Sequence, residues 1–277
     1  MIDLHSHTTA SDGQHPPAEL IRLAHQAGVR QLAVTDHDTV AGLVEARAAG
    51  TTLGVEVFAG IELSAFLGGR EVHVLGHFID PANAALAELS SKLRVERRTR
   101  MEQMVSKLAA LGVPVTLGEV EAFSGGENLG RPHLARALVE RGWVGNVKEA
   151  FDRFLGNGKP AFVDRDRLPA ARAIALIHGA GGTATLAHPA VSKVERHEIA
   201  ELAKQGLDGL EVYHSDQSPS MRAKYLAIAG ELSLVPTAGS DFHGAEVAPD
   251  RHLGSADMSP AAFAALRARA TGSRPGA

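Results

Sequence analysis

Short apolar runs alternate along this chain of 277 residues with amphipathic segments that end in glycine. The run IDLH precedes PPAELIRLAHQAG, QLAVTDH precedes TVAGLVEARAAG, TATLAHP precedes EIAELAKQG, and GLEVYHS precedes MRAKYLAIAG. Strands that alternate with helices of about 10–15 residues build βαβ units, so the pattern predicts an α/β fold with a parallel sheet. VEVFAGIELSAF and REVHVLGHFI, separated by LGG, are instead typical of two strands joined in a hairpin.

Residues 82–158 interrupt this alternation. They are rich in Arg, Glu, Leu and Ala at helical spacing, as in AALAELSSKLRVERRTRMEQMVSKLAALG, LARALVERG and VKEAFDRFLG. We expect a helical insertion domain at 82–158, a metal-binding barrel domain formed by 1–81 and 159–265, and a flexible tail at 266–277. The run RVERRTR at 94–100 contains an acidic residue and has acidic neighbours, which favours a solvated helix face over an RNA-binding patch.

The composition excludes several classes of protein. The chain has 44% hydrophobic residues, enough for a large core, and a net charge of −4, which gives no overall basic field for nucleic acid or acidic membranes. It has no cysteine, so disulfides, thiolate metal sites and cysteine nucleophiles are absent. No apolar run is long enough for a membrane span, and the first expected strand begins at Ile2, without room for a signal peptide. We therefore expect a cytoplasmic protein with no membrane association and no obligatory protein partner.

Polar residues at the ends of the apolar runs are the main functional signal. The carboxyl ends of parallel strands share one face of a barrel or sheet, so these side chains are expected to converge. A single histidine at such a position is more often structural, but here ten donors recur: His5, His7, Asp12, Asp36, His37, Glu62, His73, His188, Asp241 and His243. Imidazoles and carboxylates without thiolates suit Mn²⁺, Fe²⁺ or Zn²⁺, with Mg²⁺ as an alternative. Because one metal takes about three or four protein ligands, the set predicts two or three divalent metal ions.

Six motifs carry a family resemblance. DLHSHTTASDG, TDHDT, GIELS, HVLG, AHPA and GSDFH, in this order from Ile2 to about His243, resemble the motifs of the polymerase and histidinol phosphatase (PHP) superfamily of metal-dependent phosphoesterases. GRPHLARALVERG and GKPAFV resemble the branch that contains 3′,5′-nucleoside bisphosphate phosphatase, also called RNase AM. The resemblance implies a TIM-like fold, a distorted seven-stranded (β/α) barrel with a helical insertion domain.

The resemblance also implies a trinuclear site in which manganese is the expected ion and Fe, Zn or Mg are alternatives. One metal would be held by His5, His7, Glu62 and Asp241. A second would share Glu62 and add His73 and His188, and the third would take Asp12, His37 and His243, with Asp12 reaching in from the loop after the first strand. Asp36 is expected to orient a ligand or water.

These charges suit phosphate ester hydrolysis. Three divalent cations neutralised by Asp12, Glu62 and Asp241 leave about three positive charges, which match a phosphate dianion and a hydroxide. A metal-activated hydroxide would attack phosphorus, and no protein nucleophile is needed. His188 or Asp36 is a candidate for assisting proton transfer.

Four further residues are candidates for substrate binding. Arg131 and His133 flank Pro132, a favoured first residue of a helix, so both are expected near a helix N-terminus that attracts anions and to act as catalytic and substrate-binding residues. Lys159 follows a glycine-rich turn and is expected to begin a strand that returns to the barrel. Members of the branch carry a basic and aromatic pair soon after His-Pro, whereas this chain has HPAVSK, so Lys193 is a candidate replacement.

The leading hypothesis is an enzyme, a metal-dependent phosphatase that removes a phosphate from a 3′,5′-nucleoside bisphosphate or processes short RNA 5′ ends. Its expected partner is a small phosphorylated substrate, a nucleotide or short oligonucleotide. Histidinol-phosphate phosphatase is an alternative against which the RPH motif argues. A non-catalytic, metal-stabilised PHP interaction domain is a second alternative, disfavoured by the complete ligand set. An amidohydrolase-like barrel that cleaves C–N bonds would be expected to show a strand-end lysine.

Overall fold

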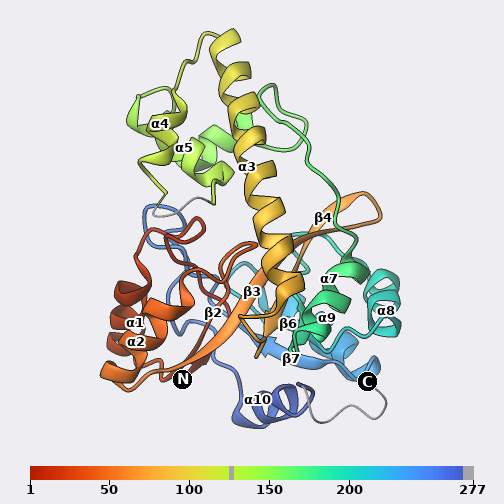
Figure 1. The fold of residues 1–277 in the computed structure, drawn as a ribbon. Helices are drawn as coiled ribbons and strands as arrows, with labels where there is room; N and C mark the ends of the chain where they lie inside the picture. The colour runs from red at the N-terminus through yellow and green to blue at the C-terminus, as the bar shows by residue number, and fades with distance from the viewer. Residues whose placement is uncertain (125–127, 271–277) are drawn as a thin grey trace.

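The computed structural model describes residues 1–124 and 128–270, and its seven strands form one sheet in sequence order (Figure 1). The strands are β1 (Ile2–Asp3), β2 (Gln31–Val34), β3 (Glu56–Leu67), β4 (Arg70–His77), β5 (Thr183–Leu186), β6 (Gly209–Tyr213) and β7 (Val235–Ala238). All neighbours are parallel except β4, which is antiparallel to both β3 and β5. Backbone hydrogen bonds from Leu4 N to Ala238 O (3.2 Å) and from Asp241 N to His5 O (2.9 Å) join the last strand to the first. The sheet is thus a nearly closed seven-stranded barrel, as predicted.

The expected hairpin is formed by β3 and β4. Leu67 pairs with Arg70 across a two-residue turn, in which Gly68 and Gly69 have φ values of 55° and 82°. Two consecutive left-handed residues suit glycine and match the twist of the strands they connect. The register places Ser64 opposite His73, so the long hairpin carries polar side chains from both of its strands into the mouth of the barrel.

Helices on the outside of the barrel bury their apolar faces against the sheet. They are α1 (Pro17–Gln26), α2 (Leu43–Leu53), α7 (Ala170–Gly179), α8 (Arg196–Lys204), α9 (Pro219–Glu231) and α10 (Pro260–Arg267). In α1 the proline at the first position fixes the helical φ, and Leu20, Ile21 and Ala24 are buried at helical spacing. None of the helices in residues 1–124 and 128–270 is both long and apolar enough to cross a bilayer.

Between β4 and α7 the chain forms a group of helices that extends above the barrel, with the shorter helices packed beside the long α3 (Figure 1). These are α3 (Ala84–Ala110), α4 (Leu117–Glu121), α5 (Arg131–Glu140) and α6 (Val147–Ala150), which continues into a π-helical turn, Phe151–Leu155. Leu86 near the start of α3 packs in the barrel core, whereas Met104 and Leu108 near its end pack in a second core with Leu134 and Leu138 of α5. Helix α3 therefore contacts both cores, and we propose the division into a barrel and an insertion with α3 as the shared element.

Two local predictions meet a different structure. The strand expected to begin at Lys159 is not formed, because Lys159 lies in a turn in which its N–H donates to Gly156 O and Pro160 follows without an N–H to donate. In the segment expected to be a flexible tail, Leu266 is buried and Arg269 donates to Asp208 O. Residues 271–277 lie outside the described part of the chain.

Candidate metal centre and phosphate pocket

Four buried side chains from three segments, the ends of β1 and β7 and the middle of β3, form the first group of donors. His5, His7, Glu62 and Asp241 place ligand atoms within 4.8 Å of one another. His5 Nε2 lies 3.3 Å from Glu62 Oε2, His7 Nε2 lies 3.1 Å from the same oxygen, and both nitrogens lie 3.2 Å from Asp241 Oδ1. Despite these distances, His5 Nε2, His7 Nε2 and Glu62 Oε2 make no hydrogen bond to any described residue. Buried donors that face one another without hydrogen bonds are the arrangement that a cation would satisfy.

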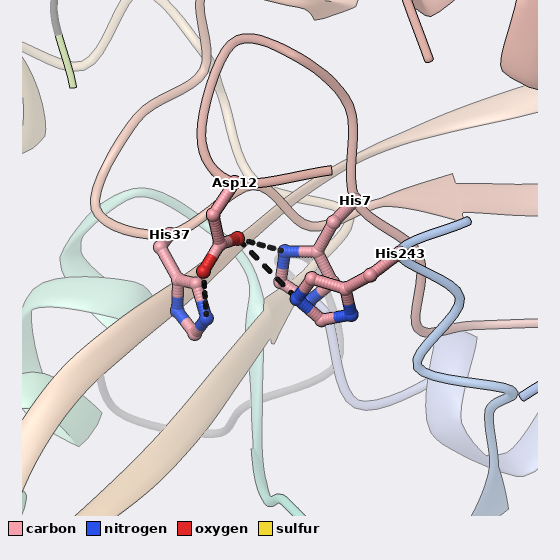
Figure 2. A group of neighbouring side chains, drawn as sticks. All are labelled: His7, Asp12, His37 and His243. Carbon is pink, nitrogen blue, oxygen red and sulfur yellow. Dashed lines mark ion pairs between the residues drawn. The ribbon is translucent and has the colours of Figure 1, made fainter. Parts of the chain in front are cut away.

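The second group surrounds Asp12 (Figure 2). Asp12 Oδ2 lies 3.7 Å from His37 Nε2, while Asp12 Oδ1 lies 3.3 Å from His243 Nε2 and 3.8 Å from His7 Nδ1. Figure 2 shows the carboxylate between His37 on one side and the rings of His7 and His243 on the other. Asp12 is only 6% exposed although it lies in a loop, and His7 contributes to this group as well as to the first.

Glu62, in the middle of the long strand β3, connects the groups. Its Oε1 lies 2.8 Å from His73 Nδ1 and 3.2 Å from His188 Nε2. Its Oε2 faces His5 and His7, and also His37 Nδ1 at 3.1 Å. The two oxygens of Glu62 thus face different histidines, which is the geometry of a bridging carboxylate. The structure brings all nine predicted ligand side chains together, and their assignment to three metals remains our proposal.

The electrostatics of the site fit a bound cation. Burial by itself lowers the pKa of His73, but the Glu62 and Glu71 carboxylates outweigh it and raise the pKa to about 10. At His7, burial is likewise outweighed by Asp241 and Glu62, which raise the pKa to about 9. The carboxylates therefore stabilise positive charge beside His7 and His73. Divalent cations bound among them would replace the protons of the imidazoles.

Asp36 lies behind the donors rather than among them. Its carboxylate accepts hydrogen bonds from Thr8 N (2.8 Å), Thr8 Oγ1 (2.8 Å) and Ser11 Oγ (2.6 Å), and Ser11 Oγ lies 3.4 Å from His7 Nδ1. Asp36 thereby stabilises the loop that leads to Asp12. It does not line the pocket that opens above the donors. This position supports the orienting role that we expect for Asp36.

A pocket of about 330 Å³ opens above the donors, and arginines from the insertion form its wall. Arg131, at the N-terminus of α5, donates to Asn157 Oδ1 (2.9 Å), and its Nη2 lies 3.7 Å from Glu71 Oε2. Its guanidinium also lies within 5.7 Å of the ring centres of Phe151 and Phe162. Arg131 therefore lies where the sequence places it, at a helix start facing the donors.

The other three predicted substrate-binding residues do not line this pocket. His133 is fully buried. Its Nδ1 accepts a hydrogen bond from Gly130 N (3.1 Å), so the His133 side chain caps the N-terminus of α5. Lys159 and Lys193 are exposed on turns. Their proposed substrate contacts have no support in the pocket geometry.

Four further arginines line the pocket: Arg97, Arg100, Arg165 and Arg251. Arg97 Nε donates to Asp38 Oδ2 (3.1 Å), so the expectation that residues 94–100 form a solvated face is wrong for Arg97 and Arg100. Residues three apart share a helix face, and this face of α3 packs toward the barrel. Arg100 Nε donates to Val163 O (2.7 Å), while its buried Nη2 has no hydrogen-bond partner among the described residues. Burial, followed by the neighbouring Arg131 and Arg165, lowers the pKa of Arg100 to about 9.

Comparisons with known proteins agree with this geometry. A family model described as "PHP domain" matches residues 3–94. A 5′-3′ exoribonuclease of Haemophilus influenzae is 38% identical over 245 residues, which cover 87% of this chain and 89% of the relative. A 3′,5′-nucleoside bisphosphate phosphatase of Chromobacterium violaceum is 36% identical over 87% of both chains. A crystal structure from Bifidobacterium adolescentis, assigned as a metal-dependent phosphoesterase, superposes with a TM-score of 0.90 at 31% identity over 97% of this chain and 96% of the other. This chain therefore belongs to the PHP family of metal-dependent phosphoesterases.

Proposed function

We propose that this protein hydrolyses a phosphate monoester of a nucleotide, converting a 3′,5′-nucleoside bisphosphate to a nucleoside monophosphate, with short RNA 5′ ends as related substrates. The observation that carries the proposal is a single pocket with metal-donor groups on its floor and arginines on its wall. The names of the two relatives support a nucleotide substrate, because one is an exoribonuclease and the other a nucleoside bisphosphate phosphatase.

The proposed metal ligands are the nine donors, with Glu62 as the bridge. Divalent cations held there would polarise phosphoryl oxygens and lower the pKa of water at the reacting phosphorus. Imidazoles combined with carboxylates suit Mn²⁺, which is the first ion to test. The orphaned nitrogens and oxygens among these side chains support at least two positions, one around His5 and one around Asp12.

The arginines of the wall would hold the phosphate in place. Arg131 and Arg100 approach the pocket from α5 and α3, and a guanidinium can bind two phosphate oxygens at once. Arg100 is suited to this task because its Nη2 has no hydrogen-bond partner among the described residues. Val147 and Phe151 line the same wall and offer apolar contact to the nucleoside part of a substrate.

The test compares phosphate release from 3′-phosphoadenosine 5′-phosphate, 5′-AMP and histidinol phosphate, using Mn²⁺-loaded protein and an EDTA-treated control. We expect metal-dependent turnover that is fastest on the bisphosphate. Arg136→Ala is a matched control for Arg100→Ala and Arg131→Ala, because Arg136 lies on α5 but pairs with the exposed Glu246 outside the pocket. Fastest turnover of histidinol phosphate, or no turnover by protein that binds Mn²⁺, would contradict the proposal.

A further inference from the structure

Behind the donor groups, β6 carries a buried acid, Glu211, that the proposed function does not use. Its side chain is fully buried. Its Oε1 lies 3.0 Å from His5 Nδ1, and its Oε2 accepts a hydrogen bond of 2.7 Å from the backbone N–H of His188. One carboxylate thus contacts two of the proposed ligands, which come from β1 and from the loop after β5.

Both contacts affect the orientation of His5 and His188 relative to Glu62, the proposed bridging carboxylate. A proton held on His5 Nδ1 by Glu211 leaves Nε2 free to act as a ligand, and His5 Nε2 is the atom that faces Glu62 Oε2 at 3.3 Å. The ring of His188 faces the other oxygen, with Nε2 3.2 Å from Glu62 Oε1. Glu211 therefore contacts one histidine on each side of Glu62.

The hydrogen bond to Glu211 stabilises the backbone of His188. His188 has a φ of +24°, a left-handed value that non-glycine residues rarely adopt, and Pro189 follows it. The hydrogen bond from His188 N to Glu211 gives the buried N–H a partner in this strained conformation. The packing also leaves no spare room, because a Cβ on Gly239 would lie 2.2 Å from His5 Cβ and 2.7 Å from Glu211 Oε1.

We propose that Glu211 is a positioning residue that fixes the ring of His5 and the backbone of His188, and thereby sets the affinity of the two metal positions that share Glu62. The alternative is that Glu211 is itself a metal ligand, because His5, Glu211 and His214 also place donor atoms within 4.8 Å of one another. Hydrogen bonds already use the polar atoms of Glu211 and His214: both oxygens of Glu211 accept, His214 Nδ1 accepts from Asp216 N (3.0 Å), and His214 Nε2 lies 3.3 Å from Asp241 Oδ2. In the first donor group, in contrast, His5 Nε2, His7 Nε2 and Glu62 Oε2 lack such partners among the described residues.

The chain supplies a closely matched control at the other end of the same strand. Asp208 precedes β6 and is 7% exposed. Its Oδ2 lies 2.8 Å from His178 Nε2 and accepts a hydrogen bond of 2.9 Å from Ala184 N. Like Glu211, it joins one imidazole to one backbone N–H of the neighbouring chain segment, but it does so away from the pocket. Asp208→Asn therefore removes a comparable buried carboxylate without touching a proposed ligand.

The experiment measures Mn²⁺ binding to the full chain by calorimetric titration and elemental analysis, beside the unfolding temperature of the EDTA-treated protein. We expect both variants to lower the unfolding temperature, and only Glu211→Gln to weaken Mn²⁺ binding, by about 10- to 100-fold, with wild-type stoichiometry at saturation. Glu211→Asp keeps the charge but withdraws the carboxylate, and it should weaken binding as well; it replaces the Gln variant if that variant does not fold.

Each result has a defined meaning. Wild-type Mn²⁺ affinity in the Glu211 variants overturns the positioning role, as does equal weakening in Asp208→Asn. Loss of one bound ion at saturation also overturns it, because Glu211 would then be a ligand itself. The inference rests on the proposed metal positions and is tested by metal affinity. A finding that the protein does not hydrolyse nucleotides would therefore leave it intact. Wild-type protein that binds no Mn²⁺ would instead overturn the metal positions themselves.

Discussion

Replacing Asp12 by Asn tests the metal position that we propose among the side chains of Figure 2. The Asp12 carboxylate lies between three imidazole nitrogens at 3.3–3.8 Å, and its Oδ1 has no hydrogen-bond partner among the described residues. Asparagine has the same shape but lacks the charge that a divalent cation needs here. The fold should tolerate the change, because burial lowers the pKa of His37 to about 3 and His7 keeps Glu62 and Asp241 as partners, so neither histidine is left as an unpaired buried charge.

The catalytic effect should be much larger. A cation that stabilises charge on the transferring phosphoryl group contributes several kcal/mol, and a loss of about 3–5 kcal/mol corresponds to about a 10²- to 10⁴-fold lower kcat/KM. The assay combines phosphate release from 3′-phosphoadenosine 5′-phosphate with elemental analysis of bound Mn²⁺, which should fall by one ion per chain. Asp208→Asn again serves as the control. An Asp12→Asn protein that retains every bound ion and turns over within about threefold of wild type would refute the assignment of Asp12.

Other consequences follow for the arginines. Arg131→Ala should raise KM and weaken inhibition by inorganic phosphate by about 10- to 100-fold with a smaller change in kcat, since a charged hydrogen bond contributes about 1.5–3 kcal/mol. Unchanged kinetic constants in a variant that loses only folding stability would count against this role. Arg100→Lys should retain more phosphate inhibition than Arg100→Ala, and equal inhibition constants would exclude Arg100 as a phosphate contact. Burial by itself raises the pKa of Asp38, but Arg97 and Arg165 outweigh it and hold the pKa below its usual value. The stabilisation from this ion pair is therefore complete above about pH 4 and is lost as the pH falls below that value. In urea denaturation of EDTA-treated protein between pH 7 and pH 3, Asp38→Asn should lose less stability than wild type, and an equal loss would contradict the pairing.

The convergence of most of the proposed ligands could be predicted because strand direction brings them together. His5 and His7 lie two apart at the end of β1, and alternate residues of an extended chain point to the same side. The segment that carries Asp241 pairs with these residues through the hydrogen bond from Asp241 N to His5 O, which closes the barrel. Glu62 is the exception, since it lies inside β3 rather than at its end. It reaches the same point because the second half of that strand pairs with β4 and extends past the barrel mouth.

The wall of the pocket could not be predicted in the same way. Arg97 and Arg100 lie on a highly charged helix, on the face that carries the buried Leu93, Met101 and Met104, and that face does not distinguish arginines that line a pocket from arginines that stay solvated. That distinction comes from the partners across the contact, Asp38 from the loop after β2 and the carbonyl of Val163 from the return to the barrel. Local sequence encodes the helix, whereas the location of an ion pair between distant segments depends on tertiary packing.

Two acids, one just before β6 and one within it, show where sequence reasoning could have gone further. In LDGLEVY, Asp208 and Glu211 lie three residues apart and make the same kind of contact, one imidazole and one backbone N–H each. Their roles differ because β6 has a direction: sites in this class of barrel gather at the carboxyl ends of the parallel strands. Asp208 stands before the strand and Glu211 lies within it, on the side of the metal donors. Strand direction, applied to every acid beside a strand as well as to the terminal histidines, would thus have selected Glu211 over Asp208.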